Sequence, residues 1–223
     1  IVVGVVGLWM GYTAFLSPAT VSEEQTVSTW SKTATFTHSA EVTRRNPVYP
    51  VGTTLQDRTA YFPLIAPELG GEHRFDYAAS ENASVDARTT VRLLTRSTDG
   101  EETYWQSSTL LGSNDATDLR PGDTLRTDYR FNLNESRRTI ERIDETFGDS
   151  IGDPEVVVQA TTRVTGTVNG RTVDRTFTSS ITLTPEGDAF VVDDPGRDRE
   201  SFEQTRRVQR TQEYPMLWKL STP

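Results

Sequence analysis

Hydrophobic and polar residues alternate with a period of two along most of this chain, which is the pattern of strands that bury one face. Between residues 30 and 43 the even-numbered positions form the apolar series, although this series also contains Lys32 and His38. Residues 85–95 and 125–133 alternate in the same way. The pattern therefore predicts a protein that is mainly β-structure.

A β-hairpin is predicted around Asn169 and Gly170, because a two-residue type I′ turn needs a positive φ at both of its central positions. With this turn, the apolar faces of residues 156–168 and 171–184 coincide, so the turn and the pattern agree. The predicted register pairs Val168 with Arg171, Val164 with Arg175, Thr162 with Phe177, Val158 with Ile181, and Val156 with Leu183.

One helix is predicted between the strands. Asn134 is a suitable N-cap residue, and Ile140, Ile143 and Phe147 recur on one face of a helix that begins there. Gly148 follows as the residue that ends the helix. We expect this helix to cross from one sheet to the other and to cover an open end of the core.

These elements together define the expected fold class. Asp99 and Gly100 predict a second hairpin turn, which joins residues 85–95 to residues 103–111. About eight strands, two tight hairpins and one connecting helix are typical of an antiparallel β-sandwich with an immunoglobulin-like architecture. We place this sandwich at residues 30–192.

The N-terminal segment has a different character, because residues 1–16 carry no charge. A helix that crosses a bilayer needs about 20 predominantly apolar residues. We therefore expect residues 1–19 to form a transmembrane helix that lacks its N-terminal part, with residues 1–16 in contact with membrane lipid, and residues 20–29 to form a linker. A signal peptide that is cleaved after Ala19 is the alternative interpretation.

Charges next to the apolar segment predict which side of the membrane the domain occupies. Glu23 and Glu24 are the first charged residues, and no basic residue precedes Lys32. The positive-inside rule then places the main domain outside the cytoplasm, at the cell membrane. Residues 193–223 form a polar tail, in which the aromatic and apolar residues 214–220 lead to a second membrane helix, form a short strand or form a cluster within the tail.

The composition excludes one class of function and indicates the environment of the protein. A net charge of −9 and a pI of about 4.8 exclude a nucleic-acid-binding protein, because nucleic acids are bound by basic surfaces. The chain contains 21 arginines but only two lysines, 32 acidic residues and 34 threonines. This combination indicates adaptation to high salt, in which repulsion between carboxylates is screened.

No group of residues has the pattern of a reaction centre. The chain has no cysteine, and its two histidines, His38 and His73, lack the spacing of a metal site. Residues 148–155 gather oxygen ligands suited to calcium but lack the EF-hand pattern, and Asn82 and Asn134 begin glycosylation sequons. We therefore assign no catalytic, cofactor-binding or metal-binding residue and no cofactor, and we expect that the protein is not an enzyme.

Several segments carry the motifs of a known family. They are residues 35–42 (TFTHSAEV), 46–52 (NPVYPVG), 61–64 (YFPL), 74–77 (RFDY) and the predicted helix at 133–148. Over about residues 27–192 the chain resembles the haloarchaeal membrane-anchored proteins of domain of unknown function 5305. The resemblance implies an N-terminal membrane helix, an outer β-rich domain and usually a second membrane helix. It also implies a link to secretion or signal-peptide processing, since some members are encoded near signal peptidases.

We expect from these observations a membrane-anchored domain of a halophilic archaeon that acts as an accessory or scaffold protein of the cell envelope. The expected partner is a protein of the membrane or envelope. Arg88, Arg92 and Arg96 form a basic stripe on one strand face, which either binds that partner or is paired with nearby carboxylates. Two alternatives stay open, namely a ligand-binding or calcium-binding adhesion module and a hydrolase with dispersed carboxylates.

Overall fold

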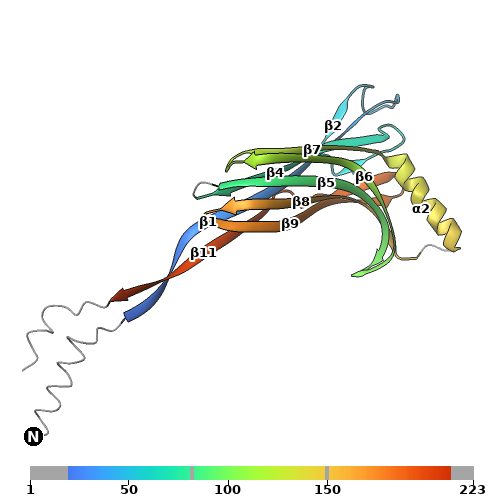
Figure 1. The fold of residues 1–223 in the computed structure, drawn as a ribbon. Coiled ribbons are helices and arrows are strands. Elements are labelled where there is room, and N and C mark those ends of the chain that lie inside the picture. The colour runs from blue at the N-terminus through green and yellow to red at the C-terminus, as the bar shows by residue number, and fades with distance from the viewer. Residues whose placement is uncertain (1–19, 81–82, 149–150, 212–223) are drawn as a thin grey trace, which may run out of the picture. The chain divides into compact units, whose positions relative to one another are not determined.

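The computed structural model describes residues 20–80, 83–148 and 151–211, and Figure 1 shows their arrangement. Residues Trp30–Phe202 form one compact unit, and the first and last strands extend beyond it. The strands are β1 (Thr20–Glu41), β2 (Thr54–Gln56), β3 (Ala60–Tyr61), β4 (Glu68–Ala79), β5 (Ala83–Asp99), β6 (Glu102–Leu119), β7 (Thr124–Asn132), β8 (Asp153–Val168), β9 (Arg171–Glu186), β10 (Ala189–Asp193) and β11 (Asp198–Thr211). The one helix of the described residues is α2 (Leu133–Phe147).

The strands form two sheets, which confirms a mainly β fold with antiparallel sheets. One sheet has five strands in the order β11-β1-β4-β7, with β2 added beside β1. The other has six strands in the order β3-β10-β9-β8-β5-β6. The pairings among β1 to β10 are antiparallel. Helix α2 follows β7 of the first sheet and precedes β8 of the second, so it connects the two sheets as expected.

The predicted registers are confirmed at the β8–β9 hairpin, where all five predicted residue pairs occur. Asn169 and Gly170 both have positive φ, at 52° and 75°. The second hairpin turn is shifted by one residue, because Asp99 pairs with Glu102 and the two turn residues are Gly100 and Glu101. Gly100 has φ 59°, so this turn places its glycine first, as a type II′ turn does.

Strands also occur in the segments that we expected to be a linker and a tail. Strand β1 begins at Thr20, inside the expected linker, and β11 occupies part of residues 193–223. Strand β11 pairs with β1 at the edge of the five-stranded sheet. Polar residues dominate the sequences of both segments, which therefore lack the alternation that marks a half-buried strand. The transmembrane helix that we expected at residues 1–19 lies outside the described residues.

The helix differs from its prediction in its N-cap and in how much of it is buried. Its N-cap is Asn132 rather than Asn134, because the Asn132 side chain accepts hydrogen bonds from the backbone N–H groups of Asn134 and Glu135. Gly148 ends the helix in the left-handed conformation, as predicted. Phe147, which we expected on the buried face, is 63% exposed. The buried residues of α2, which are Leu133, Ser136 and Ile140, lie within its first eight positions, and its last turn is exposed.

Two apolar clusters fill the space between the sheets, and a row of polar residues separates them. One cluster contains Trp30, Phe75 and Phe177, and the other contains Phe36 and Ile181, each with many neighbours. Along each central strand, one polar side chain lies between a residue of the first cluster and a residue of the second. We call these six residues the polar belt: Lys32 (β1), His73 (β4), Thr127 (β7), Thr89 (β5), Thr162 (β8) and Ser179 (β9).

The two ends of the unit are distinct. At the near end, the chain enters the unit at Trp30 and leaves it at Phe202, and these two rings stack with 4.2 Å between centroids. At the far end, beyond the polar belt, β1 ends, β4 begins and α2 starts. No helix in the described part of the chain is both long and apolar enough to span a bilayer.

Candidate functional site

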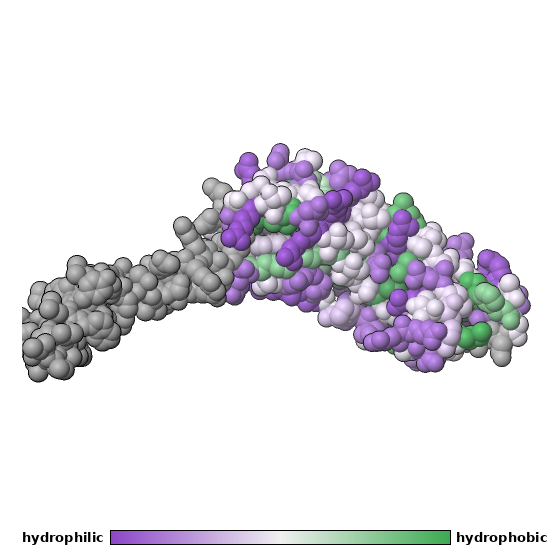
Figure 2. Space-filling model, turned by 60° about the horizontal axis from the view of Figure 1, so that its bottom comes forward, coloured by the Kyte–Doolittle hydropathy of each residue, from purple (hydrophilic) through white to green (hydrophobic). Residues whose placement is uncertain are grey.

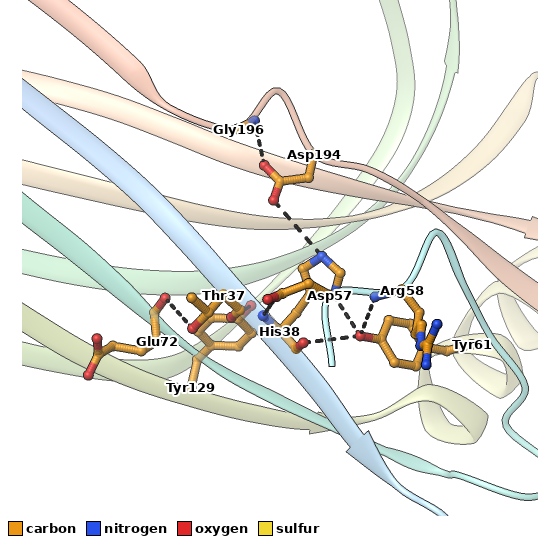
Figure 3. A network of polar contacts seen from close by, with 9 residues as sticks. All are labelled: Thr37, His38, Asp57, Arg58, Tyr61, Glu72, Tyr129, Asp194 and Gly196. Carbon is orange, nitrogen blue, oxygen red and sulfur yellow. Dashed lines mark hydrogen bonds and ion pairs between the residues drawn. The ribbon is translucent and has the colours of Figure 1, made fainter. Parts of the chain in front are cut away.

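His38 is the centre of a buried polar network at the far end, which Figure 3 shows. Its ring nitrogen Nδ1 lies 2.7 Å from the hydroxyl of Tyr61, and its Nε2 lies 3.9 Å from a carboxylate oxygen of Asp194. Its backbone N–H donates to the Asp57 carboxylate, and its carbonyl accepts from the Asp57 backbone N–H and the Tyr61 hydroxyl. The network therefore ties β1 to the segment after it and to the end of β10.

The chemistry of His38 is that of a neutral, satisfied histidine. Burial lowers the pKa of His38, and the carboxylates of Asp57 and Asp194 oppose this shift in part. The imidazole is 4% exposed, so a substrate has no direct access to it. Asp57 adopts φ 47°, a left-handed conformation held by its two hydrogen bonds to His38. The arrangement is suited to fixing the loop rather than to transferring protons.

Tyr129 completes this region from the side of β7. Its hydroxyl donates a hydrogen bond to the carbonyl of Thr37 over a distance of 2.9 Å. The ring lies over Gly71, where a Cβ atom would come within 1.9 Å of the Thr37 carbonyl oxygen and 2.7 Å of the Tyr129 hydroxyl. Gly71 is therefore required for the close approach of these strands.

His73, in the polar belt, pairs with a serine across the two sheets. Its Nε2 lies 3.1 Å from the hydroxyl of Ser179, a pairing that also occurs between a catalytic nucleophile and its base. However, His73 is 1% exposed, and burial together with the positive charge of Lys32 lowers its pKa to about 4. Its Nδ1 has no hydrogen-bond partner among the described residues, so nothing orients the ring as the third group of a triad does.

The three threonines of the polar belt differ in their hydrogen bonding. The hydroxyls of Thr89 and Thr162 bond to each other at 2.8 Å. Thr127 lies opposite His73 in the β4–β7 register and is 2% exposed. Its hydroxyl has no partner among the residues that the structure describes. The belt therefore contains both satisfied and unsatisfied buried polar atoms.

Lys32, the remaining charged member of the polar belt, is 3% exposed and forms an ion pair with Asp198 of β11. The distance from Nζ to the Asp198 carboxylate oxygen is 2.5 Å. The ammonium group also lies 5.5 Å from the centre of the Phe177 ring. This pair joins the first and last strands inside the unit.

The arginine stripe, formed by Arg88, Arg92 and Arg96, lies on the outer face of β5, as predicted, because the odd-numbered residues from Val85 to Val91 are buried against the core. Arg96 forms an ion pair with Glu155 of β8, with 2.5 Å between the side-chain atoms. Arg92 contacts the Ser108 hydroxyl at 3.4 Å. Part of the stripe is therefore paired with its neighbours rather than fully available to a partner.

The exposed apolar side chains gather at the far end, and the sequence analysis had not singled them out. Eight large hydrophobic residues are exposed in the described part of the chain: Val48, Val51, Phe62, Leu64, Tyr104, Leu110, Phe147 and Ile151. By the strand registers and element order, all eight lie beyond the polar belt. On the face that Figure 2 shows, hydrophobic residues form separate patches between hydrophilic ones.

The remaining candidate sites from the sequence are the two glycosylation sequons, the acidic loop and a metal site. Asn82 and part of the acidic loop at residues 148–155 lie outside the described residues. Asn134 belongs to the first turn of α2, and Ser136 of the same sequon is buried, so the folded helix does not present this sequon to a modifying enzyme. Within the described ranges, no cluster of three or more histidine or acidic side chains is suited to a metal ion.

The fold and these sites define a class of protein: a two-sheet β-domain whose chain enters and leaves at one end and exposes apolar residues at the other. The sequence pattern of a family of unknown function, DUF5305, matches residues 105–219, more than half of the chain. The chain therefore belongs to this family. The match begins in β6, so the expected motifs between residues 35 and 77 lie outside it.

Comparison with other proteins adds no functional information. No curated protein matches the chain. A crystal structure of a protein from Archaeoglobus fulgidus is 11% identical, with coverage of 57% of this chain and 94% of that chain and a TM-score of 0.25. β-Glucosidase 3B from Thermotoga neapolitana, in complexes with glycerol and with glucose, is 15% identical, with coverage of 63% and 19% and a TM-score of 0.22. Similarity at this level carries no argument about activity.

Proposed function

We propose that this protein is a membrane-anchored accessory or scaffold protein of an archaeal cell envelope, which binds a partner protein through the far end of its β-domain and does not act as an enzyme. The observation that carries the proposal is the separation of the two ends. Trp30 stacks on Phe202 at the near end, and all eight exposed large hydrophobic residues lie beyond the polar belt.

The near end suits a tether. The uncharged residues 1–16 precede β1 in the sequence, and the apolar and aromatic cluster at residues 214–220 follows β11. Because the unit begins and ends at one stacked pair of rings, segments that anchor the chain on either side of it would both join the unit at its near end. The acidic residues Glu23 and Glu24 support an orientation in which the domain faces outward.

The far end suits a partner. Its exposed side chains come from loops, from the end of α2 and from strand β6, so they present apolar area on several elements. Isolated exposed apolar residues are ordinary, but their concentration at one end of an acidic domain with a net charge of −9 favours a binding surface. The polar residues between them fit an interface that assembles and separates.

The test is a pull-down of the tagged, full-length protein from detergent-solubilised membranes of its host. The far-end variant carries Val48→Ser, Leu64→Ser and Phe147→Ser, and the matched control carries Arg88→Gln on the outer face of β5, on the near side of the polar belt. We expect the far-end variant to lose the captured partner while the control retains it. Loss of the partner in the control alone would place binding on the arginine stripe and contradict the proposal.

A further inference from the structure

Lys32 is an unusual residue in this chain. Arginine provides nearly all of the basic side chains, and Lys32 is one of only two lysines. It is also 3% exposed, whereas arginine is the residue that usually forms buried ion pairs, because its planar guanidinium binds a carboxylate through two hydrogen bonds. What lysine offers in place of this geometry is a primary amine, which becomes a nucleophile when it loses its proton.

The surroundings of Lys32 bring this amine against one carboxyl group. Its Nζ lies 2.5 Å from a carboxylate oxygen of Asp198, the first residue of β11, and 5.5 Å from the centre of the Phe177 ring. Burial removes most of the hydration of the Lys32 side chain, which is 4% exposed. The Asp198 side chain is 36% exposed, so a small product can leave toward solvent.

We propose that Lys32 and Asp198 are joined by an intramolecular amide bond. A proton first moves across the contact from the ammonium group to the carboxylate. The Lys32 amine then attacks Cγ of Asp198, and the tetrahedral intermediate expels one hydroxyl group, which leaves as water with a proton from the nitrogen. One C–N bond forms, one C–O bond breaks and one water molecule is released, so the step requires no oxidant, reductant or other reactant.

His73 is a further titratable group whose electrostatic influence reaches both partners. Because its pKa is lowered to about 4, its imidazole is neutral at physiological pH and adds no positive charge beside the two partners. The bond would connect residues 166 positions apart and would join β1 to β11 close to the point where the chain enters and leaves the unit. A pull on either end would then be carried by the covalent bond instead of by the hydrogen bonds between strands.

The experiment is intact-mass spectrometry of the full-length, folded protein, and it does not depend on the proposed function. We expect a mass that is lower than the sequence mass by one water molecule. Lys32→Arg and Asp198→Ala should restore the full mass of their own sequences, whereas Lys219→Arg, which removes the other lysine, should keep the loss of water. Asp198→Asn should instead lose ammonia, because the same attack then expels the amide nitrogen.

Trypsin locates the bond independently. Cleavage after Arg197 and Arg199 releases the dipeptide of Asp198 and Arg199, which we expect to remain attached to the peptide that ends at Arg44 and to protect Lys32 from cleavage. A folded wild-type protein with its full sequence mass, cleaved by trypsin after Lys32, would show that the contact is an ion pair only and would overturn the proposal. A water loss that persists in Lys32→Arg would overturn it as well.

Discussion

Two threonines of the polar belt should respond in opposite ways to the same substitution, valine. Thr127 and Thr162 are each 2% exposed, and valine replaces the hydroxyl group with a methyl group of similar size. The hydroxyl of Thr127 has no partner among the described residues, whereas that of Thr162 bonds to Thr89 at 2.8 Å. Thr127→Val should therefore stabilise the fold, and Thr162→Val should destabilise it.

The magnitudes follow from the state of each hydroxyl. Burial of a polar group without a hydrogen bond costs about 1–3 kcal/mol in proteins, so Thr127→Val should raise the free energy of unfolding by about 1–2 kcal/mol. Thr162→Val leaves the hydroxyl of Thr89, which is fully buried, without its partner and should lower the free energy of unfolding by about 1–3 kcal/mol. Replacing both Thr89 and Thr162 with valine should bring stability back close to that of the wild type.

Urea unfolding of the full-length protein in detergent and molar KCl, followed by tryptophan fluorescence, measures these differences. Thermal melts give a second readout, in which 1 kcal/mol shifts the midpoint by roughly 2–4 °C for a protein of this size. Destabilisation by Thr127→Val would refute the reasoning, because it would mean that the Thr127 hydroxyl has a hydrogen-bond partner in solution. Equal effects of Thr127→Val and Thr162→Val would refute it too.

Three further predictions concern the helix, the buried histidine and the surface charge. Asn132→Ala should lower the free energy of unfolding by about 1 kcal/mol, and Asn134→Ala should lower it clearly less. A larger loss for Asn134→Ala would show that Asn134 is the N-cap. The pKa of His73 is lowered to about 4, so protonation favours the unfolded chain, and stability should be complete above about pH 6.5 and fall as the pH approaches 4. His73→Gln should flatten this decline, and an unchanged pH profile would contradict the assignment. Melting temperatures should rise from dilute buffer to molar KCl, and to a similar degree in NaCl, because salt screens the net charge of −9; no rise would remove the argument for salt adaptation.

The strand pattern and hairpin turns could be predicted from the sequence because local rules determine them. In β1 the even-numbered residues from Trp30 to Ala40 are all buried, as the alternation indicates. The β8–β9 register follows from the two turn residues and from the requirement that both apolar faces coincide. The alternation even placed Lys32 and His38 on the buried face, although it could not identify their partners.

The remaining features depend on contacts between distant segments, which no local pattern encodes. The strand character of residues 20–29 and of β11 follows from pairing at a sheet edge rather than from alternation. Asn132 could have been found, because Glu135 follows it at the spacing of a capping box, but Asn134 offered a competing cap. The pairing of Lys32 with Asp198 becomes visible only when strands from both ends of the chain are assembled. The location of the exposed apolar residues at the far end becomes visible only when the loops, α2 and β6 are placed together.

Site-specific photo-crosslinking in intact cells tests most directly whether the far end binds a partner. A photoreactive amino acid is placed at Leu64, which is 65% exposed at the far end, and in a second strain at Thr176, which is exposed on β9 on the near side of the polar belt. The account predicts one discrete crosslinked protein from the Leu64 position and none from Thr176. A discrete product from Thr176 with none from Leu64 would contradict it.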